Sequence, residues 1–161
     1  MKVLVVFDSV FGNTRQIATA IGGGINTNAA VEICEASNFS HEKLQGLNLF
    51  IVGSPTRGFR ATPLVVNLLK NLPENSLQGI KVAAFDTRIL LSDIKSAPLR
   101  FIVKTGGYAA KPISKMLTEK GGKLILPPKG FFVGGDQGPL KEGEVERAAG
   151  WISASLVVSD F

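Results

Sequence analysis

Short apolar runs alternate with segments of helical periodicity along most of the chain. Apolar runs of four to eight residues bounded by polar residues or glycine are typical of buried strands. Such runs predict strands at Val3–Phe7, Val31–Cys34, Leu47–Val52, Ile80–Phe85 and Lys123–Leu126. Because helical segments separate successive strands, the pattern predicts a five-stranded parallel sheet covered by helices on both faces, a three-layer α/β sandwich.

The polarity of these runs separates edge strands from central ones. Val31–Cys34 is the most polar run, which favours a place at the edge of the sheet. Leu49–Val52 and Val82–Phe85 are almost continuously apolar, as expected for strands buried on both faces.

Helix boundaries follow from capping residues, proline and glycine. The first helix is predicted to begin near Thr14 and to stop at Gly22–Gly24, and the second to begin at the capping Thr62 and Pro63. Further helices are predicted near Lys111–Lys120 and over Lys141–Leu156, with Trp151 half-buried. Apolar spacing assigns an inward-facing row to the second and the last helix. These rows are Leu64, Val65, Leu68 and Leu69, and Val145, Ala148, Ala149, Ile152 and Leu156.

Two segments do not follow this alternation. Thr87–Gly107 contains two apolar clusters, and the pattern leaves open whether it forms an extra helix or an extended loop. Pro127–Pro139 is rich in proline and glycine and is predicted to be an ordered excursion before the last helix, with Asp136 as a turn residue.

Composition narrows the class of protein. A chain of 161 residues with 45% hydrophobic content fits one globular domain, residues 1–161, without disulfides. No apolar run reaches the length of a membrane span, and the single cysteine, Cys34, is compatible with the reducing cytoplasm. The net charge of +5 favours anionic partners, but no basic block is interleaved with aromatics, so we do not expect nucleic-acid binding. His41 has no neighbouring cysteine or second histidine, so no metal site is predicted.

The polar segment Ser9–Thr14 carries the clearest functional signal. It lies between the first predicted strand and the first predicted helix, where hydroxyl and amide side chains and free backbone N–H groups can hold a phosphate. It lacks the Gly-Lys-Ser/Thr end of a P-loop and the glycine spacing of a dinucleotide fingerprint. Two more loops, Gly53–Arg60 and Asp86–Arg88, follow the third and fourth strands and should meet it at the same edge of the sheet.

Together these loops resemble the flavodoxin-like family. Its phosphate loop has the form Thr/Ser-x-Thr/Ser-Gly-x-Thr, which Ser9–Thr14 follows except at Phe11, where the family usually has a hydroxyl. Gly53–Thr56 resembles the family's second loop, which lies against the flavin ring. The resemblance covers essentially the whole chain and implies strand order 2-1-3-4-5 and an FMN cofactor. The residues it assigns to the cofactor are Ser9, Val10, Phe11, Gly12, Asn13, Thr14, Ser54, Pro55, Thr56, Arg57, Gly58, Phe59, Asp86, Thr87 and Arg88.

The ring-binding residues depart from the family in ways that bear on redox chemistry. Arg57 stands where flavodoxins often have a stacking tryptophan; it either stacks on the ring or lies near its reduced charge, or it points to solvent while Phe59 stacks. A guanidinium at the ring predicts a less negative reduction potential. Gly58 could flip its peptide on reduction. The usual tyrosine is missing, so the outer ring face is covered by Tyr108 or Arg88, or is open.

Two functions follow from the resemblance. The first is an electron carrier between partner proteins. The second is an FMN-dependent oxidoreductase of the NAD(P)H/quinone type, including protoporphyrinogen-oxidase-like enzymes, acting on a small redox substrate such as a quinone. No Ser/His/Asp, Cys/His or paired-carboxylate constellation is visible, so either chemistry would be that of the flavin, with no separate catalytic residue. The third strand ends at Gly53 and Ser54 without an aspartate, which argues against a receiver domain. The sequence determines neither the partner nor the oligomeric state.

Overall fold

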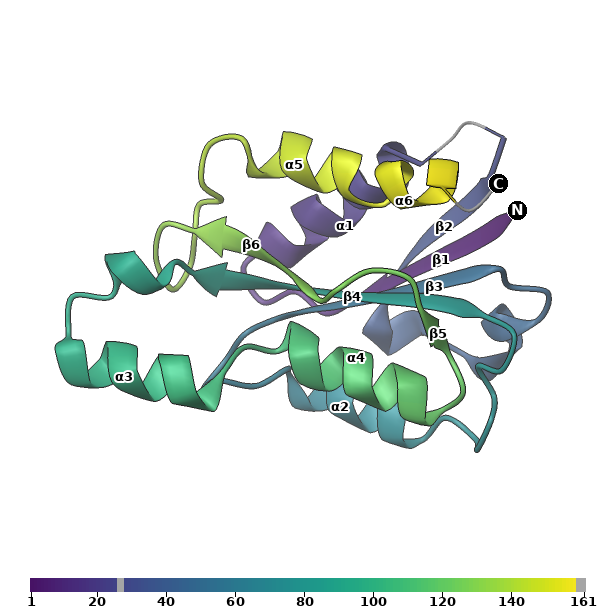
Figure 1. Cartoon of the computed structure of the whole chain (residues 1–161), viewed down its shortest axis with the longest axis horizontal. Helices are drawn as coiled ribbons and strands as arrows, with labels where there is room; N and C mark the ends of the chain where they lie inside the picture. Colours follow the sequence, from purple (N-terminus) through teal and green to yellow (C-terminus); the bar gives the residue numbers. More distant parts are fainter. Residues whose placement is uncertain (26–27, 159–161) are drawn as a thin grey trace.

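A central parallel sheet organises the chain (Figure 1). The structure is a computed structural model that describes residues 1–25 and 28–158, without the side chains of residues 102, 103, 105, 106, 157 and 158. The strands run in the order β2-β1-β3-β4-β5, as expected. Their bounds are β1 Lys2–Phe7, β2 Ala30–Glu35, β3 Leu49–Pro55, β4 Lys81–Ile89 and β5 Lys123–Leu124. The polar β2 lies at one edge, and the apolar β1, β3 and β4 lie inside.

A sixth strand, β6 (Lys129–Val133), completes the edge beyond β4. Lys81 and Val82 of β4 pair with β5, and Phe85–Ile89 pair with β6, so the two short strands extend one another along the same side of β4. Pro127 and Pro128 separate them because proline has no N–H to donate to the ladder. The segment predicted as an ordered excursion before the last helix therefore contains an edge strand of the sheet that the sequence pattern did not predict.

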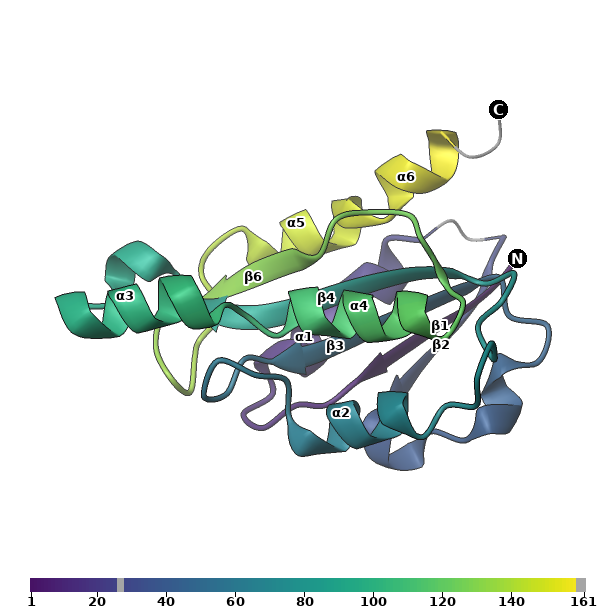
Figure 2. The ribbon, with the colours of Figure 1, turned by 60° about the horizontal axis from the view of Figure 1, so that its bottom comes forward.

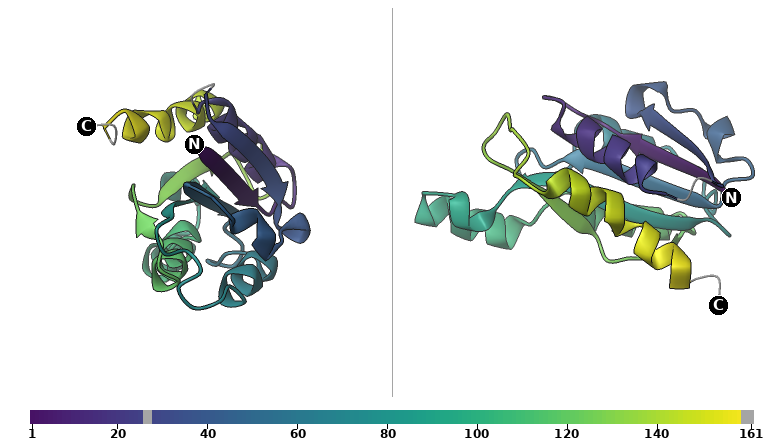
Figure 3. Two further views of the ribbon diagram at one scale, coloured as in Figure 1. Left: turned by 90° about the vertical axis from the view of Figure 1, so that its right-hand side faces the viewer. Right: turned by 90° about the horizontal axis from the view of Figure 1, so that it is seen from above.

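Helices cover both faces of the sheet, as Figure 3 shows end-on. One face carries α1 (Asn13–Gly23), α5 (Glu144–Trp151) and α6 (Ser153–Val158), and the other carries α2 (Pro63–Lys70) and α4 (Ala110–Glu119). Alternate residues of each strand pack against the two layers, so Val3 and Val5 face α1 while Leu4 and Val6 face α2 and α4. This is the predicted three-layer sandwich.

Two apolar residues expected to face inward are on the outer side of their helices. Leu64 and Val145 are each 41% exposed. In α2, Leu64 lies one position before the row that packs on the sheet, which holds Val65 and Leu69. In α5, Val145 lies one position after Glu144, which is buried together with Ala148 four residues later.

Two helix ends also differ from the sequence-based expectations. The last helix is two helices, which meet at Ile152. Thr62 occupies the N-cap position of α2, but its hydroxyl makes no capping hydrogen bond.

The undecided segment after β4 contains an extra helix. A short 3-10 turn, η3 (Leu91–Asp93), leads into α3 (Ala97–Gly106), which stands out beyond the carboxyl ends of the strands (Figures 1 and 2). Two further 3-10 turns, η1 (Ala36–Asn38) and η2 (His41–Leu44), connect β2 to β3. Within residues 1–25 and 28–158, no helix combines the length and the apolar character that crossing a membrane requires.

Candidate functional site

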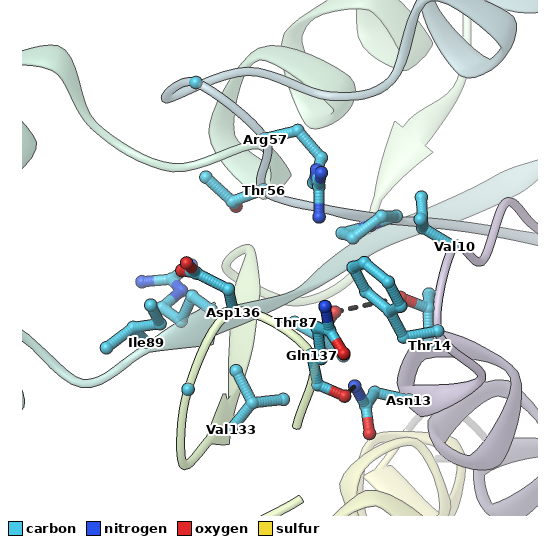
Figure 4. Close-up of a pocket in the computed structure, with 15 residues that line it drawn as sticks. Val10, Asn13, Thr14, Thr56, Arg57, Thr87, Ile89, Val133, Asp136 and Gln137 are labelled. Atoms are coloured by element: carbon cyan, nitrogen blue, oxygen red, sulfur yellow. Dashed lines mark hydrogen bonds between the residues drawn. The ribbon is translucent and has the colours of Figure 1, made fainter. Parts of the chain in front are cut away.

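A cavity of about 430 Å³ opens at the carboxyl ends of β1, β3 and β4 (Figure 4). It lies at the switch point of the sheet, because β1 is flanked by β2 on one side and β3 on the other. Its volume is within the usual range for small-molecule sites, about 300–1,000 Å³. The lining residues are Val10, Phe11, Asn13, Thr14, Pro55, Thr56, Arg57, Gly58, Thr87, Arg88, Ile89, Val133, Gly135, Asp136 and Gln137.

Most of the residues expected from the sequence reach this cavity. Ten of the fifteen line it, from all three predicted loops. The other five lie outside the lining: Ser9, Gly12, Ser54, Phe59 and Asp86. The structure adds a fourth wall that the sequence interpretation missed, the segment after β6, which supplies Val133, Gly135, Asp136 and Gln137. Asp136 lies in a turn, as expected, and also reaches the rim of the cavity.

Hydrogen bonds to the Ser9 side chain stabilise the backbone of the first loop at the start of α1. The Ser9 hydroxyl accepts hydrogen bonds from the N–H groups of Gly12 and Arg15, at 3.1 and 3.3 Å. Gly12 caps the helix with a positive φ of 92°. The N–H groups of Asn13 and Thr14, in the first turn of α1, have no earlier helical carbonyl to bind and can serve an anion.

Two side chains of this loop bind neighbouring loops, as the dashed lines in Figure 4 show. The Asn13 amide donates to the Gln137 carbonyl at 3.1 Å, which fixes the segment after β6 against α1. The Thr14 and Thr87 hydroxyls are 2.9 Å apart and share a hydrogen bond. These bonds join the first loop to the ends of β4 and β6, so three walls of the cavity are mutually positioned.

The second loop turns sharply and directs Arg57 into the cavity. Backbone bonds pair Arg57 with Arg60, and the residues between them, Gly58 and Phe59, have φ values of 54° and 68°. Two central residues with positive φ are the signature of a type I′ turn. The Arg57 guanidinium lies 5.2 Å from the ring centroid of Phe11, so the two loops touch across the cavity.

A buried carboxylate fixes the second cavity arginine. Asp86 is 0% exposed, and its oxygens accept bonds from Arg88 Nε and Nη2 at 2.6 and 2.7 Å and from the Ala110 N–H at 2.9 Å. Burial raises the pKa of Asp86, and the bonds from Arg88 and Ala110 oppose that rise. Asp86 thus acts here as the partner of Arg88.

The other surfaces of the Arg88 guanidinium are also packed. The ring centroid of Tyr108 lies 3.9 Å from its central carbon, a cation–π contact. On β6, Gly130 leaves the space that Arg88 fills, because a Cβ at this position would overlap the guanidinium. Burial raises the pKa of Tyr108, and the charge of Arg88 opposes that rise. Arg88 is therefore a fixed cation in the cavity wall.

Thr56 connects the second loop to the segment that follows α3. Its hydroxyl accepts the Ala109 N–H at 3.0 Å, and its N–H donates to the Thr87 carbonyl at 2.9 Å. Ser54 performs a similar role beneath the cavity, where its hydroxyl accepts the Thr62 N–H at 3.0 Å. Among the described side chains, no group of three or more His, Cys, Asp or Glu residues could hold a metal ion.

Comparison with solved structures places this architecture among known folds. No protein-family model matches the sequence, and no curated protein matches it either. A flavodoxin from the domain Archaea superposes with a TM-score of 0.78 at 21% identity, over 100% of both chains. Oxidised flavodoxin 2 from Bacillus cereus gives 0.73 at 21% identity, over 99% of both chains. The chain has the flavodoxin-like fold.

The same fold also occurs within larger proteins. Rubredoxin oxygen:oxidoreductase from Desulfovibrio gigas matches with a TM-score of 0.71 at 18% identity. That match covers 99% of this chain but 36% of the other. This flavodoxin-like chain therefore corresponds to complete flavodoxins and to about one third of the larger oxidoreductase.

Proposed function

We propose that the cavity binds FMN and that the protein carries electrons between partner proteins. The observation that supports this most is the position of the cavity at the switch point, with the N-terminus of the 11-residue helix α1 at one side. A helix N-terminus favours a phosphate because its first N–H groups are free and its dipole is positive there. A Cβ placed on Gly12 would meet no heavy atom within 4 Å, so a phosphate has room to approach the backbone at this glycine.

The rest of the cavity suits a flat ring. Apolar surface for the ring comes from Val10, Phe11, Pro55, Ile89 and Val133, and eight polar or charged side chains line the rest of the cavity. This mixture matches the two parts of FMN, because its ring needs apolar surface and its ribityl chain and phosphate need hydrogen-bonding groups. The residues present therefore fit FMN, with the first turn of α1 at its phosphate and the second loop at its ring.

Each part of the chain has a separate task in this proposal. Bound FMN supplies reversible electron chemistry. The first turn of α1 binds the phosphate, and Pro55 and Gly58 border the ring. Arg57 brings positive charge to the cavity, which favours a ring that has gained electrons, whereas Asp86 balances the charge of Arg88. A reduction potential less negative than that of an acidic flavodoxin is the expected consequence.

We favour a carrier over an enzyme. A complete flavodoxin matches the entire chain, and the cavity lining contains no nucleophile paired with a histidine base. We also propose that the carrier works in the cytoplasm as a single domain, residues 1–161; its one cysteine, Cys34, is buried and free, which is compatible with a reducing compartment.

The test begins with the visible spectrum of the purified protein before and after incubation with FMN. The proposal predicts a retained yellow chromophore that dithionite bleaches. Oxidation of NADH and NADPH is then followed with and without a quinone acceptor. Slow or absent turnover without an auxiliary reductase supports the carrier, whereas rapid turnover with a quinone would assign the FMN-dependent NAD(P)H/quinone-type oxidoreductase. A protein that stays colourless and does not retain FMN would contradict both functions.

A further inference from the structure

Helix α3 is fixed beside the mouth of the cavity although it stands out from the sheet (Figures 1 and 2). On its N-terminal side, the chain leaves the cavity wall at Ile89 and reaches the helix through η3. On its C-terminal side, the Tyr108 ring packs on Arg88 and the Ala109 N–H binds Thr56. Because both flanks are joined to residues that line the cavity, α3 lies next to the mouth of the cavity.

Exposed basic residues lie on the two elements that flank this mouth, the turn after β3 and α3. We call them the basic rim: Arg57 and Arg60 from the turn after β3, and Lys95, Arg100 and Lys104 from α3 and its approach. All are exposed, and none makes an ion pair within the described part of the chain. Some cations elsewhere do make ion pairs, such as Arg15 with Glu35 and Lys43 with Glu32. The charge at the cavity mouth is therefore left uncompensated.

Acidic residues offset little of this charge. Residues 54–118 contain ten of the 18 basic residues but three of the 13 acidic ones. Asp86 is buried and Asp93 pairs with Lys141, so neither offers a free carboxylate to the basic rim. Asp136 is an exposed acid at the cavity. The mouth is positive overall, although Asp136 lowers the potential on the side of β6.

Apolar side chains are exposed among these cations. Leu99 is 44% exposed and Phe101 is 68% exposed, both on α3. Protein interfaces commonly combine an apolar or aromatic centre with a charged rim. Aromatic residues and arginine are also enriched among the residues that contribute most to the free energy of binding.

We propose that the basic rim docks a small acidic electron-transfer protein, whose redox centre is brought to the cavity mouth. The proposal rests on the proposed function, because the docked partner exchanges electrons with FMN in the cavity. The reduced partner gives up one electron and is oxidised, and FMN accepts that electron and is reduced. Charge complementarity identifies the partner: an acidic face would be attracted by five unpaired cations, and a basic face would be repelled.

Electrostatic steering gives this proposal a kinetic signature. Opposite charges on two proteins raise the association rate by about 10- to 1,000-fold, and the effect falls steeply with ionic strength. Salt at about 0.1 M already screens exposed charges beyond roughly 10 Å. Electron transfer from an acidic donor should therefore be fastest at low ionic strength.

The test is stopped-flow reduction of the FMN-loaded protein by reduced plant-type [2Fe–2S] ferredoxin, used as the acidic donor. The test variant is Arg100→Glu with Lys104→Glu on α3. The control variant is Lys70→Glu with Lys123→Glu, which changes the net charge equally. Lys70 ends α2 and Lys123 begins β5, at the end of the sheet opposite the cavity.

At low ionic strength, we expect the α3 variant to lower the second-order rate constant about tenfold and the control variant to change it by less than about twofold. The wild-type rate should also fall as salt is added. Equal rates for the two variants, or a wild-type rate that rises with salt, would overturn the proposal. A third result would also overturn the proposal: the α3 variant loses binding to vesicles of anionic lipid while its reaction with ferredoxin is unchanged. The basic rim would then bind a membrane surface and not a protein.

The two proposals fail separately. Failure to retain FMN would contradict the proposed function before ferredoxin is added. A protein that retains FMN, is reduced by dithionite and yet reacts with ferredoxin at a rate insensitive to salt and to the α3 substitutions would contradict the docking proposal alone.

Discussion

Two carboxylate and arginine pairs meet strand β6 from different sides of the sheet. The cavity pair is Asp86 and Arg88 of β4; Arg88 packs against Gly130, and Asp86 accepts the Ala110 N–H on the face that carries α4. The helix pair is Glu144 and Arg147 of α5; the Arg147 Nη2 donates to the carbonyl of the same Gly130 at 2.7 Å, and Glu144 accepts the Phe132 N–H at 2.7 Å.

The two carboxylates have similar donors but opposite pKa shifts. Burial raises the pKa of Asp86 against the bonds from Arg88 and Ala110. Burial acts in the same direction on Glu144, but the bonds from Arg147 and the Phe132 N–H outweigh it, so the pKa of Glu144 is lowered. The Asp86–Arg88 pair therefore keeps charged groups in the cavity wall at a cost in desolvation free energy. The Glu144–Arg147 pair instead stabilises the attachment of α5 to β6.

Arg88→Met is expected to cause the largest loss of stability. It leaves the buried Asp86 carboxylate without its cation, which typically costs about 3–5 kcal/mol. Without Arg88 the pKa of Asp86 rises further above its unfolded value, so the folded state binds more protons and the free energy of unfolding falls as pH rises through that range. In urea unfolding, the free energy of unfolding of the variant should fall furthest below that of the wild type at neutral pH, and the difference should be smaller in acid. Arg57→Met, at an exposed position, is the control and should change stability by less than about 0.5 kcal/mol. A deficit that grows on acidification would contradict this explanation.

Gly130→Ala tests the strand position that both pairs share. Its Cβ would overlap the Arg88 guanidinium, and forcing extra volume into such a packed site costs about 1–3 kcal/mol. Gly134→Ala is the matched control on the segment after β6, because the nearest heavy atom to its Cβ is 3.6 Å away. Thermal unfolding of the two variants compares them directly. Equal stabilities would show that Arg88 can move away at no cost.

Glu144→Gln tests the helix pair. The substitution weakens charge-assisted bonds to Arg147 and should cost about 1–2 kcal/mol at neutral pH. A lowered pKa contributes stability above the ordinary value of 4.5, and the contribution is lost as pH falls through the folded value. Unfolding curves from pH 7 to pH 3 should therefore converge with those of the wild type in acid. FMN affinity should be unchanged, because Glu144 lies outside the cavity lining; a variant that binds FMN poorly would remove the distinction between the two pairs.

The smallest effect is expected for a substitution of Arg57, the cavity arginine whose charge is not neutralised by a carboxylate. Arg57 contacts Phe11 and makes no ion pair among the described residues, so its full charge acts on the cavity. Arg57→Gln should shift the potential of the two-electron reduction of bound FMN by about 10–20 mV to more negative values, which corresponds to about 0.5–1 kcal/mol. A redox titration of both proteins measures the shift. A shift to more positive values would mean that Arg57 does not favour the reduced ring.

The sequence predicted those walls of the cavity that are formed by polar loops directly after apolar strands. Ser9–Thr14 and Gly53–Arg60 follow apolar strands, so their place at one edge of the sheet could be inferred. The cavity pair could not, because β4 was expected to end at Phe85 whereas it continues through Asp86–Ile89. Polar residues in the middle of a sheet are hidden from a pattern based on hydrophobicity, since their burial depends on partners from other elements.

The wall after β6 was missed for a related reason. Pro127 and Pro128 interrupt the edge strand, and the glycines that follow resemble a loop, so Val133 and Gln137 were not assigned to the site. Phe11 shows the reverse case. The family usually has a hydroxyl at this position, whereas the structure gives the Phe11 ring a contact with Arg57 that no sequence pattern implies.

The proposed function depends above all on the first turn of α1 binding the phosphate of FMN. The decisive measurement is titration of the protein with FMN and with riboflavin, followed by quenching of flavin fluorescence, because riboflavin has the same ring without the phosphate. We expect 1:1 binding of FMN with an affinity at least about tenfold higher than that of riboflavin, and a difference that shrinks when inorganic phosphate is added. Equal affinities for the two flavins, or no binding of either, would contradict this assignment.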